Sequence, residues 1–348
     1  MKTWDVVVVG GGVIGLSLAL ELRRGGASVL VLERHQPGRE ASWAAGGMLA
    51  DREAGSHPMF RAMAQASAAM YPQWVHRLQD ESGVHVDLRE QGTIRFLDEE
   101  HVPDPLGERL SLDDLRKLEP ELMYDASAVF LLERCVDPRL LMEGLVAAAK
   151  HLGVDIASGA EVTAIELEQG RSVAALTTKS RYAAGAIVNC AGAWAGQFGP
   201  VKIPAVPVKG QMLAVTPSVV KHVVRGNGVY LIPRSHGKLV IGSTTEDAGF
   251  DKRVQPGVIQ HLHQGAAILA PNIGQAKILE DWAGLRPGTP DKLPVMGATE
   301  TSGYFVATGH YRDGILLAPV TARVMGQVIR GENPDFDLDA FSVDRFGG

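Results

Sequence analysis

A glycine-rich turn between an apolar strand and a helix constrains the fold of this chain most strongly. Residues 10–15 read GGGVIG and fit the pattern G-x-G-x-x-G. Residues 4–9 (WDVVVV) read as a buried parallel strand, and residues 13–24 place apolar side chains at helical spacing. A second apolar strand, residues 28–33, ends at Glu33. The pattern predicts a βαβ unit that binds a dinucleotide.

Each glycine of this turn has its own physical task. Gly10 permits the tight turn, Gly12 lets the backbone approach a pyrophosphate, and Gly15 allows the helix to pack closely on the strand. The helix N-terminus favours an anion. Glu33 is placed to accept hydrogen bonds from ribose hydroxyls. We therefore expect an ADP site, although the motif alone does not distinguish NAD from FAD.

The composition fits a folded protein that acts on small molecules. Of 348 residues, 45% are hydrophobic and 21% charged, and the net charge is −6 without long like-charge blocks. These values argue against nucleic acid or an anionic membrane as partner. The apolar run at residues 6–20 is too short for a membrane span, which needs about 20 residues. Cys135 and Cys190 are the only cysteines, which favours a cytoplasmic location.

The chain alternates between two kinds of segment. Helix and parallel-strand patterns dominate its two ends and part of its middle, whereas TIRFL (93–97) and QMLAV (211–215) are typical of antiparallel strands. We predict an α/β protein with two domains that are interleaved along the chain rather than sequential.

A second strand–loop–helix segment favours a flavin over a nicotinamide as the reactive group. The strand YFVAT (304–308) leads into the loop GHYRDG (309–314) and a helix over residues 315–330. The positive end of that helix suits a ring on which negative charge develops. A reduced flavin meets that description, whereas a nicotinamide ring passes from cationic to neutral.

Six sequence blocks together resemble the flavin-dependent D-amino-acid oxidase superfamily, and within it the glycine oxidase branch. The match covers almost the whole chain in order, and its last two blocks are the most distinctive. The blocks are GGGVIG (10–15), ER (33–34), ASWAAGGM (41–48), VNCAGAWA (188–195), GLRPGTPDKLPVMG (284–297) and GHYRDGILLAP (309–319).

The resemblance implies a Rossmann-like FAD-binding domain of the GR2 type, interleaved with a mostly antiparallel α+β substrate domain. The expected FAD-binding domain comprises residues 1–80, 138–200 and 282–348, and the substrate domain residues 81–137 and 201–281.

The resemblance also implies a reaction. Glycine or another small amino acid would be oxidised to an imine, which water hydrolyses to glyoxylate or another keto acid and ammonia. Oxygen would be reduced to hydrogen peroxide, and the imine could serve thiamin thiazole synthesis. Some relatives tether the flavin through a cysteine in the C-terminal region. This chain has none after Cys190, so we expect noncovalent FAD. A homo-oligomer is a further expectation.

The resemblance also assigns residues. Arg286 matches the arginine that clamps the substrate carboxylate, because its planar fork fits a carboxylate. Tyr230 matches a phenol that donates a second hydrogen bond to the same group, and Arg312 lies at the flavin edge, where it serves substrate or ring. The residues expected to bind FAD are Gly10, Gly12, Val13, Ile14, Gly15, Glu33, Arg34, Ala41, Ser42, Gly46, Gly47, Met48, Val162, His310, Tyr311, Arg312, Asp313, Gly314, Ile315 and Leu316. One position departs from the family pattern: Trp43 follows Ser42, where a small residue is usual.

Neither a catalytic base nor a metal site is expected. Hydride transfer from Cα to a flavin needs a neutral substrate amine and a correctly aimed C–H bond, so the site must mainly orient the substrate. The fragment HLH (261–263) lacks an acidic companion at metal-ligand spacing, and we expect both histidines to be solvated.

Two alternatives to an oxidase stay open at this point. The first is a dehydrogenase of the same fold that oxidises a D-amino acid, sarcosine or proline and passes electrons to an acceptor other than oxygen. The second is a flavin-binding sensor or complex subunit without turnover. Joint retention of Arg286, Tyr230 and the loop at residues 309–314 argues against the second.

Overall fold

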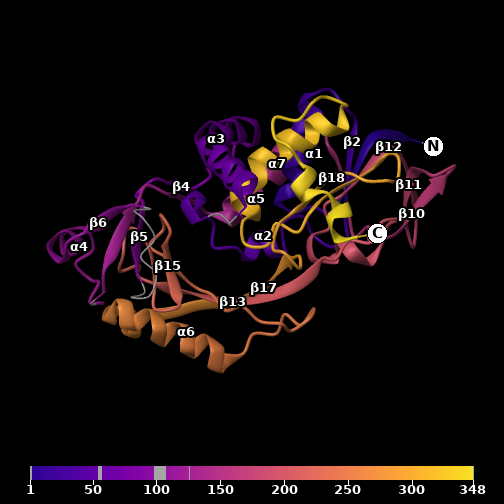
Figure 1. Cartoon of the computed structure of the whole chain (residues 1–348). Helices are drawn as coiled ribbons and strands as arrows, with labels where there is room; N and C mark the ends of the chain where they lie inside the picture. Colours follow the sequence, from indigo (N-terminus) through magenta and orange to yellow (C-terminus); the bar gives the residue numbers. More distant parts are fainter. Residues whose placement is uncertain (1, 54–56, 98–106, 125, 348) are drawn as a thin grey trace.

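The computed structural model describes residues 2–53, 57–97, 107–124 and 126–347, and three β-sheets organise them (Figure 1). One eight-stranded sheet carries the glycine-rich turn. A second eight-stranded sheet carries Arg286, and a small three-stranded sheet completes the set.

The first sheet is built around β1 (Thr3–Val9), which pairs in parallel with β2 (Val29–Glu33) and β12 (Arg181–Asn189). β2 pairs in parallel with β9 (Asp155–Ser158), and β12 with β19 (Tyr304–Thr308). The carboxyl ends of β1 and β2 therefore lie side by side at the glycine-rich turn. The antiparallel additions to this sheet are β10 (Val162–Glu168), β11 (Arg171–Thr177) and β18 (Val295–Ala298).

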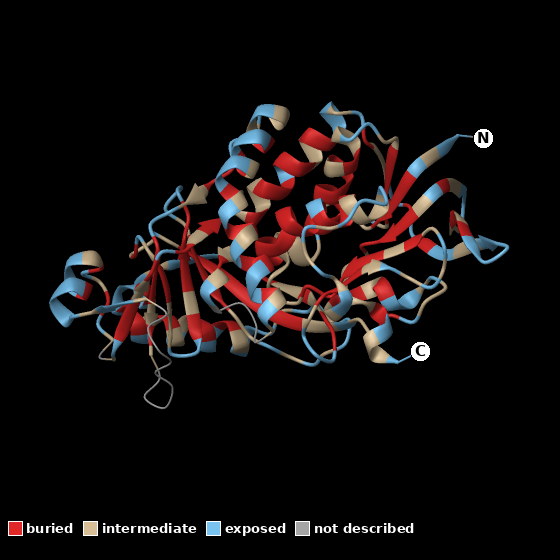
Figure 2. Ribbon diagram, turned by 45° about the horizontal axis from the view of Figure 1, so that its top comes forward, coloured by how far each residue is buried: buried red, intermediate tan, exposed pale blue. Residues whose placement is uncertain are grey.

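Side chains on β1 alternate between two cores, as the period of a strand requires. Val6 and Val8 belong to the cluster that also holds the helices, whereas Val7 and Val9 belong to the cluster on the opposite face. Figure 2 shows the helices as largely buried on their inner sides. Among the described residues, no helix is both long enough and apolar enough to cross a membrane. The helices that share a core with Val6 and Val8 are α1 (Val13–Arg24), α3 (Pro58–Ser82), α5 (Pro138–His151) and α7 (Gly314–Ile329).

The second sheet has the strand order β17-β13-β16-β15-β14-β5-β7-β6 and is antiparallel except between β14 and β5. Helix α6 (Pro256–Leu269) covers one face, where it packs with Leu213 and Leu231. Met212 and Tyr230, their neighbours in sequence, face the other way. The strands are β5 (Thr93–Phe96), β6 (Glu108–Leu110), β7 (Ala128–Leu131), β13 (Val206–Thr216), β14 (Val223–Gly226), β15 (Val229–Pro233), β16 (Leu239–Gly242) and β17 (Lys277–Gly288).

Short elements complete the chain. The small sheet has the order β3-β8-β4. Its strands are β3 (Met48–Leu49), β8 (Arg134–Val136) and β4 (Leu88–Arg89); the short α-helices are α2 (Ala41–Ala44) and α4 (Leu112–Leu118); the 3-10 helices are η1 (Asp51–Glu53), η2 (Gly192–Gln197), η3 (Pro271–Gln275), η4 (Asp339–Phe341) and η5 (Val343–Phe346).

The first turn of α7 is held in place by α3. Pro319 lies inside α7 and has no N–H to bond the carbonyl of Ile315 one turn earlier. The hydroxyl of Tyr71, buried on α3, donates to that carbonyl instead. Ser67 donates to the carbonyl of Leu316 at 2.6 Å. The bond from Tyr71 replaces the donor that the proline lacks, and the bonds from Tyr71 and Ser67 together attach the start of α7 to α3.

Several elements agree with the sequence patterns. Helix α1 has the expected bounds, and α5 begins after Asp137, whose side chain accepts from the amides of Arg139 and Leu140. The long helix α3 was not predicted. The two-domain division remains a prediction, and its expected boundary at residue 282 falls inside β17.

Candidate functional site

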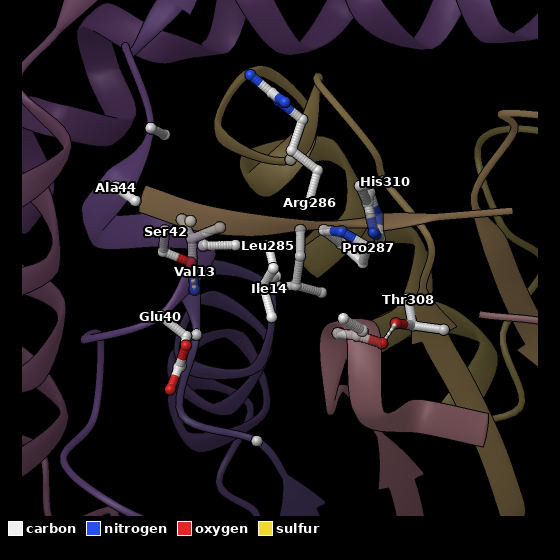
Figure 3. A pocket seen from close by; sticks show the side chains of 18 of the residues that line it. Val13, Ile14, Glu40, Ser42, Ala44, Leu285, Arg286, Pro287, Thr308 and His310 are labelled. Atoms are coloured by element: carbon white, nitrogen blue, oxygen red, sulfur yellow. Dashed lines mark hydrogen bonds between the residues drawn. The ribbon is translucent and has the colours of Figure 1, made fainter. Parts of the chain in front are cut away.

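A cavity of about 760 Å³ is lined by residues of both large sheets (Figure 3). It extends from the glycine-rich turn to Arg286 and Tyr230. The predicted residues on its wall are Gly10, Gly12, Val13, Ile14, Glu33, Arg34, Ala41, Ser42, Gly46, Gly47, Met48, Val162, Tyr230, Arg286, His310, Tyr311, Arg312, Asp313, Gly314 and Ile315. Gly15 and Leu316 are not on the wall.

The glycine-rich turn is too crowded for larger side chains at two positions. Gly10 has φ +111°, and a Cβ there would lie 2.4 Å from the carbonyl oxygen of Cys190. A Cβ on Gly15 would lie 2.0 Å from the carbonyl oxygen of Gly10. Gly15 therefore lets the helix approach the strand, as its spacing in the motif predicts, without lining the cavity.

The N-terminus of α1 opens into the cavity through the glycine-rich turn. Gly12 is its N-cap and supplies no capping side chain, and the first turn has no acidic residue. The amide of Val13 donates to Oγ of Ser42 at 2.9 Å. A helix end of this kind binds anions, so it can accept a pyrophosphate.

Glu33 is buried, and its carboxylate holds the backbone of the glycine-rich turn by hydrogen bonds. Its Oε2 accepts from the amide of Gly11 at 2.8 Å, and its Oε1 accepts from the amide of His35 at 2.9 Å. A carboxylate oxygen can accept more than one bond, so each still has capacity for a ribose hydroxyl. The ribose contact remains a prediction. The hydrogen bond to the amide of Gly11 is a second role of Glu33 that the motif did not indicate.

Replacing Glu33 with alanine should weaken FAD retention by about 1–3 kcal/mol, because both a ribose acceptor and the hydrogen bond to the amide of Gly11 are lost. The measurement is the dissociation constant of FAD, obtained by titrating apoprotein and following flavin fluorescence. Glu33→Gln keeps one acceptor oxygen and should fall between the two. Unchanged FAD affinity in Glu33→Ala would contradict the assignment.

The wall beside Arg34 is aromatic. The Arg34 guanidinium lies 3.6 Å from the centre of the Trp194 ring and pairs with Glu40 at 3.3 Å. Phe250 lies against Trp194 from another side, with ring centres 5.3 Å apart. These planar groups can flank the adenosine part of a dinucleotide.

The N-terminus of α7 forms another part of the cavity wall. His310 is buried, which lowers its pKa to about 3, so the ring is neutral near pH 7; its Nε2 lies 3.1 Å from Oγ1 of Thr321. Burial raises the pKa of Asp313 to about 6, against the opposing charge of Arg312. Arg312 is exposed and donates to Oγ1 of Thr245 at 2.8 Å.

Arg286 lies on β17 and contacts only neutral acceptors. Its Nη2 donates to Oγ of Ser243 at 2.6 Å, and its Nη1 donates to the carbonyls of Thr244 at 3.1 Å and Lys209 at 3.4 Å. Arg286 forms no ion pair with any described carboxylate. A partly buried, unneutralised guanidinium on a cavity wall is suited to an anionic ligand.

Tyr230 lies on the same wall with its hydroxyl weakly engaged. Its hydroxyl contacts the sulfur of Met212 at 3.7 Å, which is a poor acceptor. Arg225 stands opposite Tyr230 across the β14–β15 hairpin and also lines the cavity. Sequence reasoning missed Arg225. The Asn-Gly turn at residues 227–228 could have indicated it, because a two-residue turn fixes which residues face one another.

Trp43 is accommodated by an arginine between two indoles. The guanidinium of Arg139 lies 3.6 Å from the Trp43 ring centre and 4.6 Å from that of Trp282. Arg139 also pairs with Glu280 at 2.8 Å. Trp43, the residue that departs from the family pattern, therefore packs outside the cavity wall.

No group of three or more potential metal ligands occurs in the described part of the chain. The two histidines of the HLH fragment behave differently. His261 is exposed as expected, but His263 was wrongly expected to be solvated, since it is partly buried and its Nε2 lies 2.9 Å from the carbonyl oxygen of Ile273.

The fold and the cavity, which is lined by residues of both large sheets, define a dinucleotide-binding protein. A family model described as FAD dependent oxidoreductase matches residues 5–328. The chain belongs to this family, and FAD is its cofactor. The predicted fold class and the resemblance to the D-amino-acid oxidase superfamily are thereby confirmed.

Individual relatives are similar to this chain over almost its whole length. A glycine oxidase of Geobacillus kaustophilus is 34% identical over 369 residues, which cover 99% of this chain and 98% of that protein. The crystal structure of glycine oxidase from Geobacillus kaustophilus superposes with a TM-score of 0.94 at 32% identity, covering 100% of both chains. The bifunctional protein ThiO/ThiG of Trichormus variabilis is 35% identical over 362 residues, 99% of this chain but only 55% of that protein. The chain thus spans about half the length of that relative.

Proposed function

We propose that this protein oxidises glycine or another small amino acid. The overall reaction consumes the amino acid, water and oxygen and yields the keto acid, ammonia and hydrogen peroxide. The unpaired guanidinium of Arg286, on the wall of a cavity that begins at an ADP-type cradle, carries this proposal. It is supported by the glycine oxidase relatives.

In this proposal the chain's residues mainly orient the substrate. Arg286 binds the substrate carboxylate with its fork, and Tyr230 donates a second hydrogen bond to the same group. Both side chains reach the cavity from the second sheet, so together they would fix the carboxylate and with it the orientation of Cα. FAD, when bound, supplies the acceptor for the two electrons and the Cα hydrogen.

The residues proposed for FAD rest on the resemblance and on their place on the cavity wall. The start of α1 and Ser42 would hold the pyrophosphate, Glu33 and Arg34 the adenosine ribose, and Val162 the adenine. The loop from His310 to the start of α7 would hold the flavin ring. Cys190 lines the cavity, but burial raises the pKa of its thiol and keeps it a poor nucleophile, which supports noncovalent FAD.

Three broader assignments belong to the same proposal: location, metabolic role and oligomeric state. Both cysteines are free and buried, which fits a reducing cytoplasm. Because relatives include bifunctional ThiO/ThiG proteins, we propose that the imine product can serve thiamin thiazole synthesis. A homo-oligomer is also proposed, on the resemblance alone.

Adding glycine to the purified holoprotein should release glyoxylate, ammonia and peroxide in equal amounts. Turnover should rise with pH into the alkaline range, because only the neutral amine has a lone pair to assist hydride departure. Asp313 titrates near pH 6 and is a separate group on the wall, so Asp313→Asn should keep the alkaline rise. A monotonic fall above pH 6 would contradict a mechanism without a base.

The same assay separates the alternatives. Glyoxylate formed only with a dye or quinone acceptor would identify a dehydrogenase. A flavin that no amine in a panel of glycine, sarcosine, proline and D-amino acids bleaches under anaerobic conditions would identify a binding protein without turnover.

A further inference from the structure

The guanidinium of Arg286 rests on a glycine and on a neighbouring loop. A Cβ added to Gly210 would lie 2.5 Å from both Nη1 and Nη2, so the group lies flat over the β13 backbone. It donates to Ser243 and Thr244, which follow β16, and to the backbone carbonyl of Lys209 on β13. The orientation of Arg286 therefore depends on how this loop is fixed to β13.

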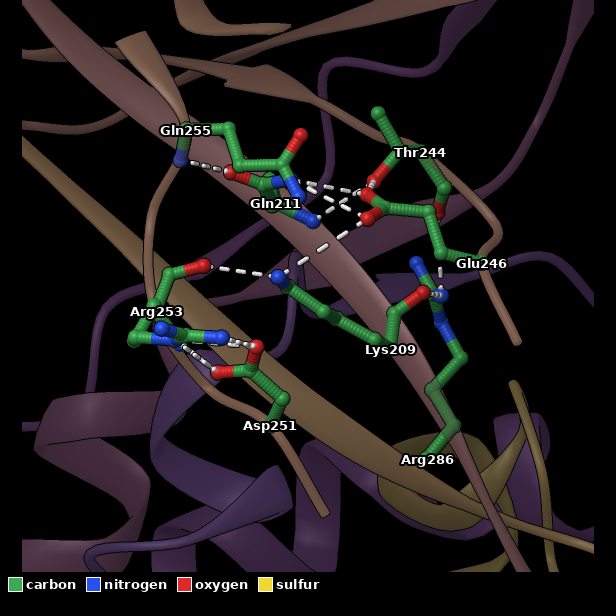
Figure 4. Close-up of polar contacts among 8 residues, drawn as sticks. All are labelled: Lys209, Gln211, Thr244, Glu246, Asp251, Arg253, Gln255 and Arg286. Carbon is green, nitrogen blue, oxygen red and sulfur yellow. Dashed lines mark hydrogen bonds and ion pairs between the residues drawn. The ribbon is translucent and has the colours of Figure 1, made fainter. Parts of the chain in front are cut away.

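The loop is fixed to β13 by a short antiparallel bridge. The amide of Lys209 donates to the carbonyl of Glu246 at 3.0 Å, and the amide of Glu246 donates back at 2.9 Å. The amide of Gln211 donates to Oγ1 of Thr244 at 2.9 Å. This arrangement brings the acidic side chain of Glu246 into the same small region as Arg286 (Figure 4).

Glu246 is nevertheless bound to other groups. Its carboxylate accepts from Nε2 of Gln211 at 2.9 and 3.2 Å and from the hydroxyl of Thr244, and Nζ of Lys209 lies 3.8 Å away. Figure 4 shows these contacts on the side of the loop away from the Arg286 side chain. The acid nearest in sequence to the Arg286 contacts is thus fully engaged elsewhere.

Lys209 and Gln211 are themselves rigidly held. Both are completely buried, with 0% exposure. Nζ of Lys209 donates to the carbonyl of Arg253 at 2.6 Å, and Oε1 of Gln211 accepts from the amide of Gln255 at 2.7 Å. A buried ammonium needs a nearby opposite charge, and Glu246 supplies it. The two charges compensate one another, and Arg286 is left as the uncompensated cation.

We propose that Lys209 and Gln211 are positioning residues that hold the carboxylate of Glu246 away from Arg286 and so keep the guanidinium available to the substrate carboxylate. This inference rests on the proposed role of Arg286. Without Lys209, the partner open to Glu246 is Arg286, and an internal carboxylate then competes with the substrate's own.

Replacing Lys209 with methionine should therefore raise the KM for glycine and the Kd for acetate about tenfold, because a competent fraction of about one tenth lowers apparent affinity by that factor. The kcat should change less than about threefold, since bound substrate still meets a free Arg286. Acetate binding is read from the change in flavin absorbance of the holoprotein. The double variant Lys209→Met with Glu246→Gln should return both constants to within about threefold of the parent, because no competing carboxylate remains.

Rescue by the double variant distinguishes a positioning role of Lys209 from a purely structural one. If the double variant is as impaired as Lys209→Met, or if Lys209→Met binds acetate normally, the proposal is wrong. Gln211→Leu, tested with and without Glu246→Gln, repeats the comparison if Lys209→Met does not fold. Lys238→Met is the matched control, because Lys238 pairs with Glu280 at 2.7 Å and has no contact with Arg286; its constants should be unchanged.

The acetate titration distinguishes failure of this inference from failure of the proposed function. Weak acetate binding in Arg286→Ala together with normal binding in Lys209→Met would remove the inference and keep the proposed function. Normal acetate binding in Arg286→Ala would remove both.

Discussion

Arg286→Ala should give a folded, yellow protein whose kcat/KM for glycine is lower by about 3–5 kcal/mol of transition-state binding, roughly a hundredfold to several thousandfold. The large effect is expected because the side chain carries the unpaired positive charge on the wall and because losing it removes the group that fixes Cα. FAD content should be normal, since Arg286 lies on β17 in the second sheet, apart from the glycine-rich turn.

Arg286→Lys should lie between the parent and Arg286→Ala. An ammonium restores the charge but not the planar fork, and it cannot reach Ser243 and Thr244 in the same geometry. A neutral amine without a carboxylate should be indifferent to either change. Steady-state kinetics with flavin content for each variant checks this. Near-normal efficiency in Arg286→Ala would show that another group, such as Arg312, holds the carboxylate.

Gly15→Ala should yield protein that is largely colourless. The added Cβ would lie 2.0 Å from the carbonyl oxygen of Gly10, a backbone atom that cannot move without deforming the turn. Overpacking of this kind costs about 1–3 kcal/mol or more, and here the strain falls on both the start of α1 and the turn that binds the pyrophosphate. FAD retention and the melting temperature are the measurements.

Gly257 supplies the control for that substitution. It lies in α6, and a Cβ there would meet nothing within 4 Å. Gly257→Ala should therefore keep its FAD and its stability, with a gain of up to about 1 kcal/mol from helix propensity. Full flavin occupancy in Gly15→Ala would show that the turn can adapt, contrary to the close packing described above.

The local part of the FAD site could be predicted from the sequence because it depends on short-range geometry. The turn at residues 10–15, the strand that ends at Glu33 and the loop before α7 each combine a strand, glycines and a helix start within a few residues. Such segments have few alternative conformations. The predicted residues accordingly lie on the wall of one cavity, with Gly15 and Leu316 just outside it.

The surroundings of Arg286 could not be predicted in the same way. Glycine and proline flank this residue, yet it lies within a twelve-residue strand paired along its length with β13. Its contacts with Ser243 and Lys209 join residues that are far apart in sequence. They depend on strand register, which one residue of slippage would change entirely. The hydrogen bond from Tyr71 to the carbonyl of Ile315 could not be predicted either, because it joins two helices through residues 244 positions apart in sequence.

The order of strands in the first sheet also determines when the protein can fold. β1 pairs with β12, more than 170 residues later, and β12 in turn pairs with β19. Contacts between such distant segments form slowly, since a long loop must close before any pairing is gained. During synthesis, α1 can pack on β2 and α5 early, but the part of its surface that packs on α7 stays exposed until α7 has been made. That exposed apolar surface is open to aggregation until most of the sequence has emerged.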